Sequence, residues 1–104
     1  MIQKQTPIRS YLQDIRIVIQ YAPLGIVRAV AERIGPRQMW VNTGFVTLND
    51  NTEIEIVVTV PGSDGAASHR IPAQVSGCGE AGHSTLNFHR CSSEAMQALR
   101  PYFG

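Results

Sequence analysis

The segment Glu53–Val60, EIEIVVTV, limits the possible folds more than any other part of the sequence. Its apolar residues Ile54, Ile56 and Val58 recur at every second position, and the residues between them are mostly polar. Side chains of a β-strand point to opposite faces in turn, so this period places the three apolar residues on one face. Pro61-Gly62 ends the pattern. The segment therefore predicts a half-buried strand that is central to the fold.

Other short segments also favour extended structure, and turn-forming glycine, proline and asparagine residues separate them. The sequence IVRAVAE is ambiguous, because its alanines and charges suit a helix. Its β-branched residues and the following Gly35-Pro36 favour a strand, and we interpret it as one. Pro72 predicts an edge position or a bulge in its strand. Besides Glu53–Val60, the expected extended segments are Ile15–Tyr21, Ile26–Glu32, Met39–Val41, Phe45–Leu48, His69–Val75 and Thr85–Arg90.

The hydrophobic period changes near the C-terminus. Ser92 is a suitable N-cap, Glu94 stands where the first helical turn favours an acid, and Pro101 stops the pattern. The apolar stripe between them consists of Ala95, Met96 and Leu99. These signals predict one short helix over 93–100. Many short strands followed by a single helix predict a mainly β fold, a small antiparallel barrel capped by that helix.

The composition is that of one globular domain spanning residues 1–104. With 43% hydrophobic and 16% charged residues, the chain is long enough to bury about two-thirds of its unfolded surface. The formal net charge of +1 gives no electrostatic reason to expect nucleic acid as a partner. The first residues lack the apolar core of a signal peptide, and no run approaches the about 20 apolar residues of a spanning helix. We expect a cytoplasmic protein without membrane insertion.

Side chains with catalytic or metal-binding potential form no recognisable motif. Cys78, His83, His89 and Cys91 are zinc-ligating types, but their spacing lacks the paired knuckles of structural zinc sites. Without a signal peptide, both thiols are expected to be reduced. No catalytic signature occurs, and nothing locates a histidine beside a cysteine as its base. The sequence predicts no enzyme, no metal site and no bound cofactor.

Arginines gather around the turn at Gly35-Pro36. Arg28, Arg33 and Arg37 flank it, and Arg9 and Arg16 lie upstream. A guanidinium group donates two parallel hydrogen bonds, a geometry that suits phosphate and guanine. A phosphate site is one interpretation of this cluster. The other is that these arginines are simply solvated.

Four segments resemble PilZ domains in their order and spacing, namely VAERIGPRQMWVNT, NTEIEIVVTVPG, TLNFHR and SEAMQALRPYF. In that family a strand runs into a turn of the form D-I-S-P-G-G-M-F-V, a G-T-x-V-x-I-type strand follows, and a later G-x-x-F strand precedes a helix. The resemblance covers nearly the whole chain and lies in the order of the pieces. It implies a six-stranded antiparallel β-barrel with a short C-terminal α-helix, a fold that typically receives the bacterial second messenger cyclic di-GMP.

The segment 33–41, RIGPRQMWV, departs from the family at its ligand-contacting positions. Family members bind cyclic di-GMP with an R-x-x-x-R pair ahead of the first strand and a [D/N]-x-S-x-x-G turn. Here Arg33 replaces the acidic or amide residue, Gly35 the serine and Gln38 the final glycine. No arginine pair at the required interval precedes the first strand. Losing several hydrogen bonds worth roughly 1.5–3 kcal/mol each predicts the loss of ordinary cyclic di-GMP binding. The surrounding apolar pattern is kept by Ile34, Pro36, Met39, Trp40 and Val41.

Two functions fit these observations. The first is a PilZ-like signalling or adaptor module that binds a protein partner, in type IV pilus assembly, motility or a related second-messenger pathway, as the resemblance implies for divergent members. The alternative is a cyclic di-GMP receptor in which Arg9, Arg33 and Arg37 form a non-standard phosphate clamp. In the first case exposed aromatic side chains are the expected anchors, although Trp40 suits core packing equally well. These anchor candidates are Trp40, Phe45, Tyr102 and Phe103.

Overall fold

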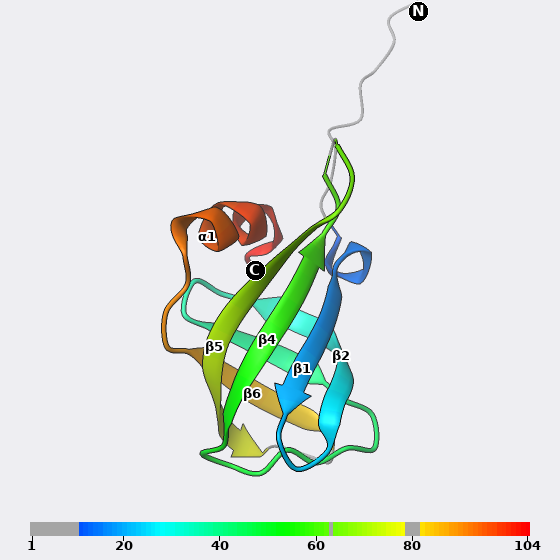
Figure 1. Cartoon of the computed structure of the whole chain (residues 1–104), viewed down its shortest axis with the longest axis vertical. Helices are drawn as coiled ribbons and strands as arrows, with labels where there is room; N and C mark the ends of the chain where they lie inside the picture. The colour runs from blue at the N-terminus through cyan, green and yellow to red at the C-terminus, as the bar shows by residue number, and fades with distance from the viewer. Residues whose placement is uncertain (1–10, 63, 79–81) are drawn as a thin grey trace, which may run out of the picture.

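The chain forms a closed six-stranded antiparallel β-barrel from strands with alternating apolar residues, and one short helix lies near the C-terminus (Figure 1). This computed structural model describes residues 11–62, 64–78 and 82–104. The predicted mainly β class, the barrel and the single helix are confirmed. A short 3-10 helix, η1 (Leu12–Asp14), precedes the barrel. The strands are β1 (Arg16–Tyr21), β2 (Gly25–Ile34), β3 (Gln38–Asn42), β4 (Glu53–Val60), β5 (Ala67–Cys78) and β6 (His83–Phe88).

The barrel consists of two three-stranded meanders, β1-β2-β3 and β4-β5-β6. Antiparallel pairing of β1 with β4 and of β3 with β6 joins them into a ring in the order β1-β2-β3-β6-β5-β4. Each strand therefore has two neighbours. The expected strands at 15–21, 26–32, 39–41, 53–60, 69–75 and 85–90 all form, and the ambiguous IVRAVAE segment belongs to β2.

Pro72 does not occupy the predicted edge or bulge. It lies within β5 opposite Glu55 of β4, and the irregularity of β5 falls later, between Ser76 and Cys78. The carbonyl oxygen of Pro72 accepts a hydrogen bond from the backbone N–H of His89 at 2.9 Å. The N–H and C=O of a strand residue point to the same side, so the missing N–H faces β6 just beyond its last residue, Phe88. The proline therefore leaves unmade only the reciprocal bond to His89, which lies beyond the end of β6.

The predicted inward faces form the core. Ile17 and Ile19 of β1 are buried, as are Ile56 and Val58 of β4. Their alternation with outward residues is the period expected from the sequence. Further fully buried side chains come from the other strands and the β3–β4 connection, namely Ile34, Met39, Val41, Leu48, Ile71, Val75 and Leu86.

The C-terminal segment lies at one end of the barrel (Figure 1). Helix α1 (Ser93–Leu99) begins as predicted, because the Ser92 hydroxyl accepts a hydrogen bond from the N–H of Ala95 at 3.1 Å. Leu99 and Ala95 are buried. A 3-10 helix, η2 (Arg100–Tyr102), follows. The backbone then bridges in parallel from Phe103 to Ile34, which fastens the C-terminus to the end of β2.

The connection 43–52 lies at the opposite end of the barrel (Figure 1). Phe45–Leu48 is not the expected extended piece of a sheet; it belongs to an irregular loop that buries Leu48 completely. The loop is attached to β1 through a side chain, because the N–H of Asn49 donates to the hydroxyl of Tyr21 at 3.1 Å. The loop continues to a second attachment, where the N–H of Asn51 donates to the carbonyl of Val75 at 2.8 Å. This end of the barrel is held by contacts from both meanders.

Candidate functional site

The segment 33–41 forms the β2–β3 turn and its flanks. The N–H of Gly35 donates to the carbonyl of Gln38 at 2.8 Å, and Ile34 pairs with Met39 across the turn. Ile34, Met39 and Val41 are completely buried. Three of the five apolar positions that carry the resemblance are thus core positions, whereas Trp40 is half-buried and Pro36 is exposed.

Arg33 is held against the barrel wall. Its guanidinium carbon lies 4.8 Å from the centre of the Trp40 ring, and its Nε donates to the carbonyl oxygen of Gly104 at 3.1 Å. Trp40 is its cross-strand partner and is half-buried. A guanidinium over an aromatic face is an attractive cation–π contact. Arg33 therefore joins β2, β3 and the C-terminus.

Arg37 lies in different surroundings. It lines a pocket of about 400 Å³ together with Arg90 and other residues of the β6–α1 linker, and Arg33 does not contribute to that lining. Arg9, the third member of the expected phosphate clamp, lies outside the described residues. Arg33 and Arg37 therefore do not share this pocket.

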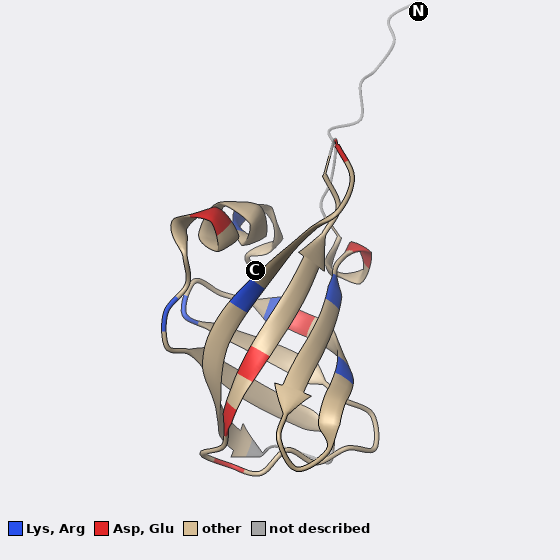
Figure 2. Ribbon diagram, viewed as in Figure 1, with Lys and Arg blue, Asp and Glu red and all other residues tan. Residues whose placement is uncertain are grey.

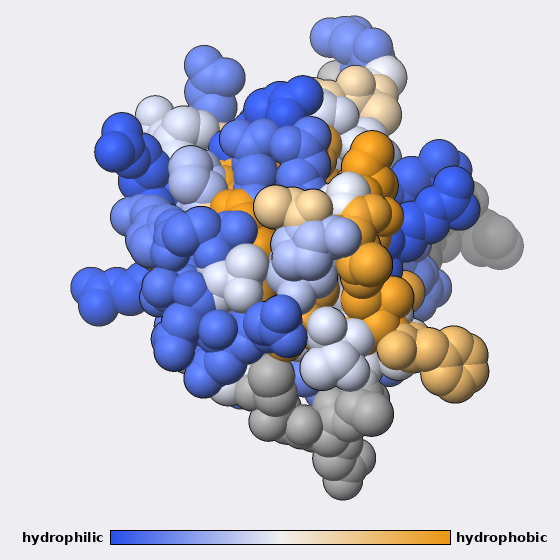
Figure 3. Space-filling view, turned by 60° about the horizontal axis from the view of Figure 1, so that its bottom comes forward, coloured by the Kyte–Doolittle hydropathy of each residue, from blue (hydrophilic) through white to orange (hydrophobic). Residues whose placement is uncertain are grey.

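Exposed apolar side chains gather elsewhere, on the outer face of β2 and in two nearby loops. Ile26 is 70% exposed, Val30 63%, Leu24 of the β1–β2 turn 62%, and Phe45 of the 43–52 connection is fully exposed. We call these four residues the apolar face. Figure 3 shows a strip of hydrophobic surface on the barrel end that carries these loops. Single exposed apolar residues are ordinary, but a gathered set marks an interaction site.

Two hollows flank the apolar face. One, of about 490 Å³, is lined by Ile26 together with Tyr21 and residues at the start of β4. The other, of about 480 Å³, is lined by Val30, Arg28 and the Asn42–Gly44 segment that precedes Phe45. Exposed apolar side chains can insert into pockets of a partner, and the neighbouring hollows can receive side chains of that partner.

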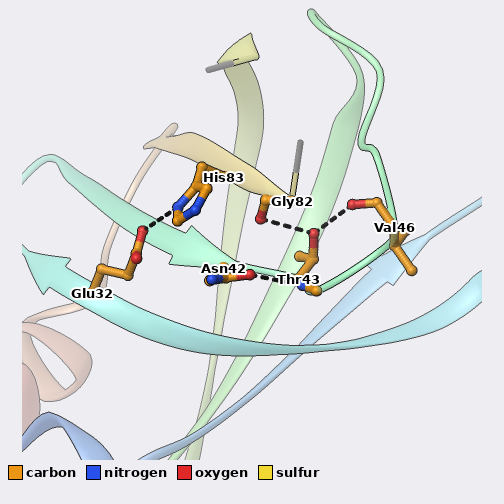
Figure 4. Close-up of polar contacts among 7 residues, drawn as sticks. Glu32, Asn42, Thr43, Val46, Gly82 and His83 are labelled. Atoms are coloured by element: carbon orange, nitrogen blue, oxygen red, sulfur yellow. Dashed lines mark hydrogen bonds and ion pairs between the residues drawn. The ribbon is translucent and has the colours of Figure 1, made fainter. Parts of the chain in front are cut away.

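Hydrogen bonds fix the turn that presents Phe45 (Figure 4). The buried Thr43 hydroxyl donates to the carbonyl of Val46 at 2.6 Å and lies 3.2 Å from the carbonyl of Gly82. The N–H of Thr43 donates to Gly82 at 2.7 Å, and the N–H of Gly44 donates to Asn42 Oδ1 at 2.8 Å. Phe45 is therefore an exposed aromatic residue on a turn whose two ends are tied.

Gly82 and His83 connect this turn to the start of β6 and the outside of β2. A Cβ atom at Gly82 would lie 2.1 Å from the carbonyl oxygen of Gly44, and Gly82 has a positive φ of 86°. Only glycine fits there without movement of the backbone. His83 Nδ1 lies 2.9 Å from Glu32 Oε1 on β2 (Figure 4). The approach of β6 to the 43–46 turn is thus close and specific.

The four predicted aromatic anchors differ in how exposed their side chains are. Phe45 is exposed, Trp40 is half-buried under Arg33, and Phe103 is half-buried at its bridge to β2. The expected exposure of Tyr102 is wrong: η2 turns its side chain into the core, where it is 8% exposed.

The other members of the apolar face, Leu24, Ile26 and Val30, were missed from the sequence. The sequence signal for an exposed apolar residue was two adjacent apolar residues in a strand, as at Ile26 and Val27. Adjacent side chains of a strand point to opposite faces, so one of the two lies on the outer face.

Within the described residues, no group of three or more histidine, cysteine, aspartate or glutamate side chains could hold a metal ion. His83 faces Glu32, and His89 Nε2 lies 2.5 Å from Glu53 Oε1. Cys91 is half-buried, and burial raises the pKa of its thiol. The side chain of Cys78 lies outside the described part. No helix in the described ranges is long and apolar enough to cross a membrane.

Comparison with protein-family models finds no match for this chain, and comparison with curated proteins finds none either. The resemblance to PilZ domains therefore stays a prediction. The six-stranded barrel agrees with the fold that it implies.

Proposed function

We propose that this chain is a PilZ-like adaptor domain that binds a partner protein through the apolar face. The observation that carries the proposal is the placement of fully exposed Phe45 on a hydrogen-bonded turn whose residues Thr43 and Gly44 line a hollow together with Val30 of β2. Aromatic side chains that insert into a partner's pocket dominate the energy of many interfaces. Because the turn is already ordered, less conformational entropy is lost on binding.

The partner segment should be apolar and carry an acidic side chain. Arg28 lies between Ile26 and Val30 on the outward face of β2, since these residues follow at intervals of two. Among the residues described, no carboxylate forms an ion pair with Arg28. A charge at the centre of an apolar contact is costly to bury unless the partner supplies the opposite charge.

The altered β2–β3 turn supports a protein rather than cyclic di-GMP as the ligand. Arg33 already stacks on Trp40 and donates its Nε–H to Gly104, so the position of its guanidinium is set by the barrel and one of its donors is occupied. Gly35 and Gln38 supply neither the hydroxyl nor the glycine of the family turn. We place the domain in a bacterial, cytoplasmic signalling pathway of the kind that controls pili or motility.

Site-specific photo-crosslinking tests the proposed surface. A photoreactive phenylalanine analogue at position 45 should capture a defined partner in cells, whereas the same analogue at exposed Gln97 of α1 should not. Ile26→Asp should abolish the capture, because it places a charge in the contact. Tyr11→Ser is the matched control, since Tyr11 is an exposed aromatic outside the apolar face. Equal capture from positions 45 and 97 would count against the proposal.

Calorimetry separates the adaptor from the receptor. We expect no heat when cyclic di-GMP is titrated to about 100 μM, a concentration at which weak complexes still form. Saturable heat would instead favour the receptor hypothesis.

A further inference from the structure

The β2–β3 turn and the β6–α1 linker together form a pocket of about 400 Å³ that is separate from the apolar face. Arg37 contributes from the turn and Arg90 from the linker, while Pro36, Phe88 and Met96 supply apolar wall. Both arginines line this pocket, and Figure 2 shows Lys or Arg positions close together where the β2–β3 turn meets the β6–α1 linker. Cationic groups on one side and apolar groups on the other are the lining that an amphiphilic anion requires.

The backbone that carries these two arginines is fixed. The N–H of Phe88 donates to the carbonyl of Arg37 at 2.9 Å, which ties the turn to the end of β6. Two residues before Arg90, the chain is thus in the β3–β6 ladder, and His89 is attached to β5 through its N–H to Pro72 at 2.9 Å. The backbone positions from which the two arginine side chains extend are therefore fixed, and the side chains themselves are exposed.

The charge of the pocket is not neutralised from within. Across residues 11–62, 64–78 and 82–104, no carboxylate forms an ion pair with Arg37 or Arg90. The nearby carboxylate of Glu53 is engaged by His89. Two unpaired guanidinium groups favour an anion with several acceptor oxygens, because each fork donates parallel hydrogen bonds.

We infer that this pocket binds a phosphate ester of a small ring-bearing molecule, with the phosphate between Arg37 and Arg90 and the ring against Phe88 and Met96. The volume is within the range of small-ligand sites. An inorganic anion would use only the arginines and leave the apolar wall exposed. This site is independent of the proposed protein contact, because none of its lining belongs to the apolar face.

Amide chemical-shift titrations of the whole chain at low ionic strength test the inference with three probes: inorganic phosphate, phenyl phosphate and adenosine 5′-monophosphate. We expect saturable shifts at Arg37, Phe88 and Cys91, and binding of at least one of the two esters about tenfold tighter than that of inorganic phosphate. Tighter binding of the nucleotide would identify a ring joined through a sugar, and tighter binding of phenyl phosphate a ring joined directly.

Paired variants assign the shifts to this pocket. Arg37→Gln with Arg90→Gln should weaken binding of the preferred ester about tenfold or more. The control, Arg16→Gln with Arg28→Gln, removes the same charge from exposed positions outside the pocket and should leave the affinity unchanged. Equal effects of the two double variants, or equal affinity for all three probes, would overturn the assignment.

Discussion

The guanidinium group of Arg33 lies 4.8 Å from the centre of the Trp40 ring, directly across the β2–β3 ladder. The same side chain donates to the carbonyl of Gly104. The residue that the predicted resemblance aligns with a ligand-contacting acid or amide of PilZ domains is thus part of the scaffold of this barrel.

Removing the Arg33 contacts should destabilise the barrel slightly. Arg33→Met keeps the length of the side chain but loses the cation–π contact and the hydrogen bond to Gly104, so we expect the free energy of unfolding to fall by about 1–2 kcal/mol. Urea unfolding followed by the fluorescence of Trp40, the only tryptophan of the chain, measures this. Arg28→Met, at a position without an ion pair among the described residues, should change stability by less than about 0.5 kcal/mol. Equal losses would contradict the structural role of Arg33.

Restoring the family residues in the turn should not by itself restore cyclic di-GMP binding. A Cβ at Gly35 would meet its nearest atoms at 3.5 and 3.7 Å, ordinary contact distances, so Gly35→Ser is sterically tolerated. Combined with Arg33→Asp and Gln38→Gly, it should give a folded protein that still lacks the arginine pair ahead of β1. We expect no calorimetric heat with the dinucleotide. Heat would show that the turn alone is sufficient.

Gly82 should be intolerant of any side chain. Gly82→Ala combines a positive φ with a collision against the Gly44 carbonyl, so we expect a loss of about 2–5 kcal/mol in the free energy of unfolding. Gly44→Ala is the matched control, because Gly44 also has a positive φ but open space around it. Its loss should be only about 1–2 kcal/mol. Chemical unfolding of both variants makes the comparison, and similar losses would argue against the close approach of β6 to the turn.

Thr43 should control how firmly Phe45 is presented. Thr43→Val removes the hydroxyl that bonds to Val46 and leaves buried carbonyl oxygens less satisfied, a cost of about 1–3 kcal/mol. Thr59→Val is the control, because the Thr59 hydroxyl pairs with that of Ser68 on an exposed face. Hydrogen exchange at residues 43–46 should accelerate only in the first variant. Unchanged exchange would mean that the backbone bonds alone hold the turn.

The thiol of Cys91 should titrate above its ordinary value of 9.0, because burial disfavours the thiolate and raises its pKa. The thiolate is the form that reacts, so in a Cys78→Ser chain the rate of alkylation should keep rising with pH past 9.0 before it levels off. The raised pKa also makes stability depend on pH. The folded state holds the proton of this thiol more tightly than the unfolded state, so the free energy of unfolding falls as the pH rises above 9.0. An alkylation midpoint below 9.0 would contradict the burial.

Most of the fold was predictable from local patterns. The alternation in Glu53–Val60 and the Ser92 cap each depend on neighbouring residues alone, and both are confirmed. The loop 43–52 was not predictable, because partners of its backbone come from distant parts of the chain, such as the Tyr21 hydroxyl that accepts from the N–H of Asn49. The place of Pro72 inside a strand paired on both sides was not predictable either, because it depends on which strands flank β5.

The candidate sites were less accessible to sequence reasoning. Phe45 was one of four aromatic anchor candidates, and nothing in the sequence separated it from Tyr102, which is buried. Arg37 was grouped with Arg33 by proximity in sequence, whereas its neighbour in the structure is Arg90, more than fifty positions away. Proximity of that kind depends on the pairing of β3 with β6.

The ring of strands also has a consequence for synthesis. β1 pairs with β4, and β3 pairs with β6, so a chain emerging from the ribosome has strands with unpaired edges until β6 has been made. Pairings between distant segments form slowly, since the entropy of closing the intervening loop must be overcome first. The unfinished chain can therefore associate with other chains through its unpaired strands, and this exposure ends when β6 pairs with β3 and β5.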